Sequence, residues 1–65
     1  MNYRDCNYTI KIIGKDSVID CYTKEQLLNN IKHPKGCIVY AMNHNTRKAE
    51  LLTAIKPYEE LTNDD

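Results

Sequence analysis

Three cysteines and two histidines are the residues of this 65-residue chain that could bind a metal or act as nucleophiles. Protein zinc sites usually draw their ligands from closely spaced pairs of such residues. The one set available would join Cys21, His33, Cys37 and His44, whose spacings fit no zinc-finger or zinc-ribbon pattern. The third cysteine is Cys6. An odd number of cysteines without a CxxC pair predicts three reduced, buried thiols. The sequence therefore predicts no metal and no cofactor.

The sequence offers little else for catalysis. The single serine, Ser17, falls in an expected turn, and two glycines are too few to build a loop that cradles a nucleotide. No paired-carboxylate motif or helix-turn-helix pattern is present, and nothing marks a thiol as activated by a neighbouring base. We therefore expect a protein that is not an enzyme.

The charges of the chain cancel overall but are unevenly distributed. Nine basic residues balance nine acidic ones, so no global field attracts nucleic acid or a membrane. Residues 1–56 carry nine positive and five negative charges, and the other four acidic residues follow Pro57. We interpret residues 1–57 as one domain and residues 58–65 as an acidic tail. The tail is either a solvated end or a segment that docks on a basic partner.

A short helix is the best-defined element. Thr23 and Gln26 have the spacing of a capping box, which marks the start of a helix. Pro34 disfavours helical backbone at the residue before it, so we expect the helix at about residues 24–32. The side chains expected to face a sheet are Leu27, Leu28 and Ile31.

Strand patterns lie on both sides of this helix. The alternation in residues 7–13, the turn formers at 14–17 and the β-branched residues of 18–22 predict a hairpin. Residues 37–42 form the most apolar β-rich run, which predicts a central strand.

Residues 47–56 fit two structures. Their composition favours a helix, whereas the polar turn before them favours an antiparallel return strand beside the central one. We choose the strand, which gives an α+β domain of order ββαββ, with one short helix packed on a four-stranded antiparallel sheet. The alternative order is ββαβα.

The absence of catalytic motifs favours a small protein–protein interaction module, such as an inhibitor or regulator. Exposed sheet edges can pair with another chain, and tyrosine is enriched at interfaces. The frequent Asn, Ile and Lys, seven of each, have A/T-rich codons and suggest a bacterial or phage genome. The start lacks the apolar core of a signal peptide and no run is long enough to span a membrane, so we expect a cytoplasmic location. The candidate partner-binding residues are Tyr3, Tyr58, Glu59, Glu60 and Leu61.

Self-association is a further expectation. We place Ile13, Val39, Leu52 and either Val18 or Ile19 on the sheet face away from the helix. That face would be more apolar than a solvated face normally is, and small domains often cover such surface by oligomerisation. We expect a homodimer, through facing sheets or paired edges, unless a foreign protein binds the same surface.

Nucleic-acid binding by the basic body is the less favoured alternative. The cations are spread along the chain, and the isoelectric point near 6.7 is far below that of a typical nucleic-acid-binding protein. The residues that would contact phosphates are Lys11, Lys15, Lys35, Arg47 and Lys48.

Overall fold

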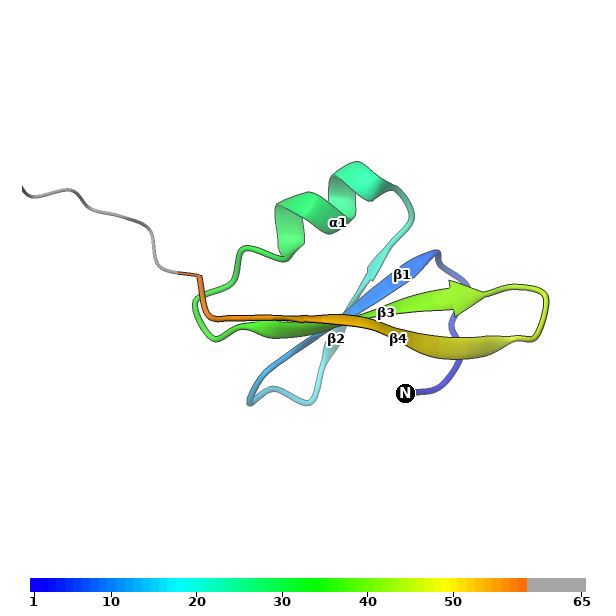
Figure 1. Cartoon of the computed structure of the whole chain (residues 1–65), viewed down its shortest axis with the longest axis horizontal. Helices are drawn as coiled ribbons and strands as arrows, with labels where there is room; N and C mark the ends of the chain where they lie inside the picture. The colour runs from blue at the N-terminus through cyan, green and yellow to red at the C-terminus, as the bar shows by residue number, and fades with distance from the viewer. Residues whose placement is uncertain (59–65) are drawn as a thin grey trace, which may run out of the picture.

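The computed structural model describes residues 1–58, which form four strands and one helix in the order ββαββ (Figure 1). The elements are β1 (Tyr8–Ile12), β2 (Val18–Cys21), α1 (Lys24–Asn30), β3 (Cys37–Asn43) and β4 (Lys48–Ile55). The strands form one antiparallel sheet of order β2-β1-β3-β4. The predicted four-stranded α+β fold is confirmed, including the strand within residues 47–56. No helix among residues 1–58 is long and apolar enough to cross a membrane.

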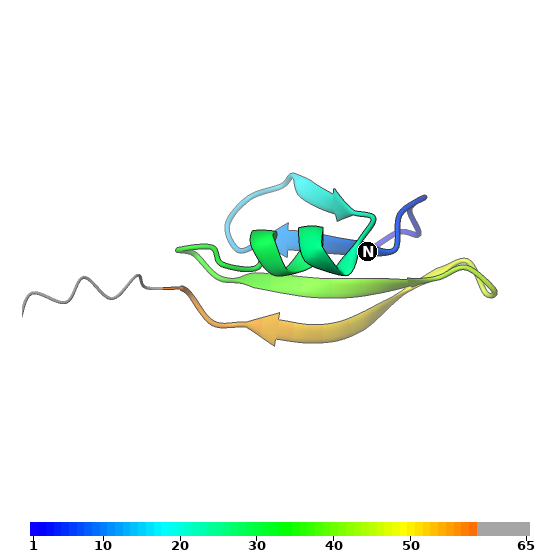
Figure 2. The same cartoon turned by 90° about the horizontal axis from the view of Figure 1, so that it is seen from above.

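The hydrophobic core lies between α1 and one face of the sheet, which we call the inner face (Figure 2). Residues directly opposite each other in an antiparallel sheet point to the same side. Ile10 of β1 lies opposite Ile19 of β2 and Val39 of β3, so these three form one inner row. The buried core comprises Ile10, Ile12, Cys21, Leu27, Cys37 and Val39, bordered by Tyr8, Ile19, Ile31 and Ile55. Because α1 packs against β1 and β2, it leaves β4 without a helix above it.

The start of α1 is capped by the predicted pair, Thr23 and Gln26, but the Gln26 side chain bonds the amide of Tyr22 and not that of Thr23. The Gln26 amide donates to the Thr23 hydroxyl at 3.1 Å, and the Gln26 side-chain oxygen accepts from the Tyr22 amide at 2.8 Å. Thr23 itself is extended, with φ −126° and ψ 158°. The first bond satisfies an amide that the first turn of a helix leaves without a partner, and the second fixes the chain just before the cap.

The helix differs from the prediction in one side chain and in its end. Leu28 is 54% exposed, while Leu27 is 8% exposed and enters the core. Successive helical residues are about 100° apart, so a helix of two turns can point one of two adjacent leucines at the sheet but not both. The helix also ends at Asn30, with Ile31 as its cap, two residues before the predicted end.

The predicted composition of the second sheet face, which we call the outer face, is partly wrong. Val39 is 1% exposed on the inner face, because it lies opposite Ile10. Val18 lies opposite Lys11 on the outer face, whereas Ile19 points inward. Ile13 and Leu52 are indeed exposed, at 46% and 54%. A helix and a loop separate the two hairpins, so the sequence pattern alone did not fix the relative register of β1 and β3.

Candidate functional site

Strand β4 is the most exposed element of the sheet. It lies at one edge and pairs only with β3, and six of its eight residues are exposed. Leu51 is 69% exposed and Leu52 54%. Thr53 and Ala54 are also exposed, and no charged residue occurs between Leu51 and Ile55. We call Leu51, Leu52, Thr53 and Ala54 the β4 strip.

The outer face continues the apolar surface of the β4 strip. Tyr40 and Ile38 of β3 are half-buried and lie opposite Leu51 and Ala54, respectively. Leu52 is the extra residue at a register shift opposite Val39 and Tyr40. Such bulges, together with charges and prolines, usually limit pairing at sheet edges. Here the middle of the strand has the bulge but no charge.

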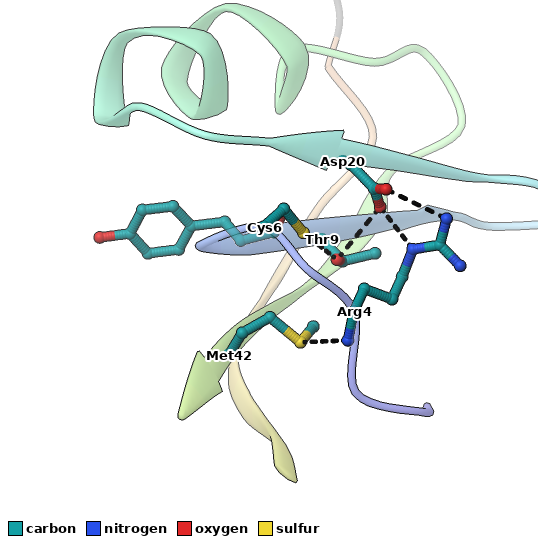
Figure 3. A network of polar contacts seen from close by, with 6 residues as sticks. Arg4, Cys6, Thr9, Asp20 and Met42 are labelled. Atoms are coloured by element: carbon teal, nitrogen blue, oxygen red, sulfur yellow. Dashed lines mark hydrogen bonds and ion pairs between the residues drawn. The ribbon is translucent and has the colours of Figure 1, made fainter. Parts of the chain in front are cut away.

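The N-terminal segment, residues 1–7, covers a different part of the outer face (Figure 3). Arg4 donates to both carboxylate oxygens of Asp20 on β2, at 2.6 and 3.0 Å. This hydrogen bonding, assisted by the charge of Arg4, lowers the pKa of the Asp20 carboxyl. The Arg4 amide contacts the Met42 sulfur at 3.4 Å, and Met42 is 6% exposed.

Cys6 and Thr9 form the buried centre of this contact. Thr9 is fully buried, its hydroxyl lies 3.1 Å from the Cys6 sulfur, and it donates a longer bond of 3.4 Å to Asp20. The Cys6 thiol also donates to the Tyr8 carbonyl at 3.1 Å. Thus the one buried polar side chain among residues 1–58 has partners supplied by the N-terminal segment and β2. These contacts fix the segment onto the sheet.

A chain of hydrogen bonds links Tyr3, His44, Asn7 and the backbone of Tyr22. The Asn7 side-chain amide donates to the Tyr22 carbonyl at 2.7 Å, so its oxygen is left to accept from Nε2 of His44 at 2.9 Å. In neutral His44 the other ring nitrogen must then accept, from the Tyr3 hydroxyl. The Tyr3 and His44 rings also meet edge to face, with centroids 5.6 Å apart. Tyr3 is therefore partly engaged within the chain itself.

The candidate metal ligands and thiols are not brought together. Cys21 and Cys37 occupy the core, and burial raises the pKa of both thiols. His33 precedes β3 and His44 follows it, so the strand separates the two rings. Among residues 1–58 no group of three or more potential ligands is placed to hold a metal ion.

The five cations of the nucleic-acid alternative divide between the two ends of the sheet. Arg47 and Lys48 lie at the β3–β4 turn. Lys11 and Lys15 lie at the β1–β2 turn, joined by a bond from the Lys11 ammonium to the Lys15 carbonyl, and Lys35 lies in the loop before β3 at the same end. Two further lysines, Lys32 and Lys56, are also at this end. We call Lys11, Lys15, Lys32, Lys35 and Lys56 the lysine end.

The two tyrosines predicted to bind a partner lie at opposite ends of the molecule. Tyr3 contacts His44 beyond the end of β3, whereas the Tyr58 amide donates to the His33 carbonyl at 2.9 Å, before the start of β3. Tyr58 is 44% exposed. Glu59, Glu60 and Leu61 are outside the residues that the structure describes. Tyr3 and Tyr58 therefore do not form one surface.

Comparison with protein-family models, curated protein sequences and solved structures gives no match for this chain. The β4 strip was not among the predicted partner-binding residues. A sequence signal for it existed, because the adjacent Leu51 and Leu52 interrupt strict alternation and place apolar side chains on both faces of the expected strand.

Proposed function

We propose that this chain is a small, non-catalytic protein–protein interaction module that binds its partner through the β4 strip. The observation that carries the proposal is the exposure of Leu51 and Leu52 in the middle of an edge strand. An edge strand offers unpaired backbone N–H and C=O groups, to which a partner strand can add. Exposed leucines beside that edge supply the apolar contact that backbone hydrogen bonds alone lack.

A second copy of the chain is the first partner to consider. In antiparallel pairing of two β4 strands about a two-fold axis, the middle of each strand meets the middle of the other. The midpoint of Lys48–Ile55 falls between Leu51 and Leu52, so the leucines of both copies would gather at the axis. From this midpoint to Ile55 the strand has no charged residue, and toward Lys48 the nearest charged residue is Glu50. These features support a homodimer.

A foreign protein could use the same surface, and the chain would then act as an inhibitor or regulator of that protein. A second copy of the chain and a foreign protein would both need the β4 strip, so they would compete for it. In either case the bound form buries Leu51 and Leu52, and each additional 100 Å² of apolar surface removed from water contributes about 2.5 kcal/mol before the costs of association.

The proposal is tested by Leu51→Asp, with Leu28→Asp as the matched control. Both leucines are exposed, at 69% and 54%, but Leu28 is on α1, away from the strip. Circular dichroism first establishes that each variant folds. Sedimentation across a concentration series, and affinity capture from a lysate of the source cells, then measure self-association and foreign binding.

We expect the parent and Leu28→Asp to share a dimer or a captured protein that Leu51→Asp loses. If all three are monomeric and capture the same proteins, or none, the β4 strip is not a binding surface. If Leu28→Asp alone loses binding, the partner docks on α1 and the proposal is wrong.

A further inference from the structure

We infer that the lysine end is a second binding surface, and that its ligand is single-stranded nucleic acid. This inference goes beyond the proposed protein-binding function and uses residues at a different place. It rests on three features: the convergence of three segments, the imbalance of charge where they meet, and an exposed aromatic ring among the lysines.

Three segments are held together at this end of the sheet by backbone contacts. The Ile13 amide donates to the Gly36 carbonyl at 3.1 Å, which joins the β1–β2 turn to the loop before β3. The Tyr58 amide donates to the His33 carbonyl, which joins that loop to the chain beyond β4. Figures 1 and 2 both show these segments at the end of the sheet opposite the β3–β4 turn. Lysines that are far apart in the sequence therefore share one end of the molecule.

The described residues at this end carry more positive than negative charge. Lys15, Lys32, Lys35 and Lys56 are exposed, and Lys11 is half-buried. Asp16 is the one acidic residue of the segments 13–17, 32–36 and 56–58. The other acidic residues among residues 1–58 are Asp5, Asp20, Glu25 and Glu50, which belong to the N-terminal segment, β2, α1 and β4. Lysines act as point charges toward phosphates and bind them without fixing a base sequence.

Tyr58 favours nucleic acid over an acidic protein as the ligand. Its side chain is 44% exposed, its backbone is fixed by the bond to His33, and it follows Lys56 by two residues. Ile13, 46% exposed, adds a second apolar side chain at this end. Surfaces that bind single strands combine cations for the phosphates with an aromatic ring on which a base stacks. An acidic peptide has no base and makes no use of the ring in this way.

The next two residues in the sequence, Glu59 and Glu60, carry charge of the opposite sign. Carboxylates that follow Tyr58 so closely in the sequence oppose the binding of a polyanion to Lys56 and Tyr58. The full-length variant Glu59→Gln/Glu60→Gln should therefore bind nucleic acid more tightly than the parent, and more so at low salt, where charges are less screened.

The experiment uses fluorescence anisotropy of a labelled twelve-nucleotide oligo-dT titrated with the full chain at 50 and 200 mM salt. Four exposed lysines on phosphates give a slope of about −2.8 in log affinity against log salt, and so a loss of about 50-fold between the two salt concentrations. Lys35→Gln/Lys56→Gln should reduce the slope to about −1.4. Arg47→Gln/Lys48→Gln, at the other end of the sheet, is the matched control and should leave the slope unchanged. Tyr58→Leu should weaken binding about fivefold or more at an unchanged slope.

Three results would overturn the inference, once circular dichroism shows that the variants fold. The first is no anisotropy change at 50 mM salt. The second is an equal loss in the Arg47→Gln/Lys48→Gln control. The third is binding of a labelled oligoglutamate peptide as tight as that of the oligonucleotide and insensitive to Tyr58→Leu, which would assign the lysine end to an acidic protein. None of these results bears on the β4 strip, because none of the variants used here changes Leu51, Leu52, Thr53 or Ala54.

Discussion

Asp20 is the side chain that does most to hold the N-terminal segment on the sheet. It accepts two hydrogen bonds from Arg4 and a longer one from the Thr9 hydroxyl, whose other close side-chain neighbour is the Cys6 sulfur. Loss of its charge would remove the ion pair and weaken the polar contacts around a fully buried hydroxyl. The Arg4 amide of this segment contacts the sulfur of Met42, so a loosened segment would also lose its contact with β3.

The lowered pKa of Asp20 makes this contact depend on pH. A carboxyl with a lower pKa in the folded than in the unfolded state stabilises the fold above its unfolded pKa of about 3.9, and the effect is lost as the pH falls through the folded value. Asp20→Asn should therefore be less stable than the parent at pH 7, and the gap should narrow below about pH 4. Urea unfolding at a series of pH values measures this. A gap of constant size would mean that the ion pair contributes nothing to stability.

At the scale of the elements, the helix, the first hairpin and the central strand follow from local chemistry, whereas the composition of β4 favours a helix and its strand structure depends on pairing with β3. The cap at Thr23, the turn residues at 14–17 and the β-rich run at 37–42 act over a few neighbouring residues, and the structure has the elements that they predict. Which leucine of α1 enters the core does not follow from them. That choice depends on the rotation of the helix on the sheet, which is set by contacts with β1 and β2.

The two adjacent leucines of α1 give a direct test of the helix orientation. Leu27→Ala should reduce the free energy of unfolding by about 2–4 kcal/mol, because it leaves a cavity in the core. Leu28→Ala should change it by less than about 0.5 kcal/mol, because its side chain is largely in solvent. Denaturant unfolding of both variants is the measurement. Equal losses would show that the helix packs on the sheet differently.

Gly36 tests the packing of the loop before β3. Gly14 and Gly36 both have positive φ, at 84° and 78°, so alanine at either position costs about 1–2 kcal/mol of backbone strain. A Cβ at Gly36 would lie 2.9 Å from the Ile55 carbonyl oxygen, whereas one at Gly14 meets nothing within 4 Å. Gly36→Ala should therefore be destabilised more than Gly14→Ala, by about a further 1–3 kcal/mol. The measurement is the midpoint of thermal unfolding of Gly36→Ala and Gly14→Ala. Equal midpoints would contradict the close approach of this loop to the end of β4.

At the scale of the whole molecule, the features that carry function depend on which segments meet. The sequence spreads its lysines over 46 positions, from Lys11 to Lys56, and the antiparallel order of the strands brings five of them to one end. The predicted face of Val39 was wrong for a similar reason. It depends on the pairing of β1 with β3, which are separated in the sequence by β2, α1 and the loops between them. Local patterns carry little information on such long-range pairing.

The central claim is that the β4 strip binds a protein partner, and amide hydrogen exchange tests it most directly. The measurement compares exchange in dilute protein with exchange at high concentration, and then with the captured partner added. We predict that the amides of Leu51–Ala54 that do not donate to β3 exchange fast in the dilute chain and become protected on self-association or on partner binding, while those of β2, at the other edge, do not change. Protection that appears at β2 or α1 and leaves β4 unchanged would contradict the claim.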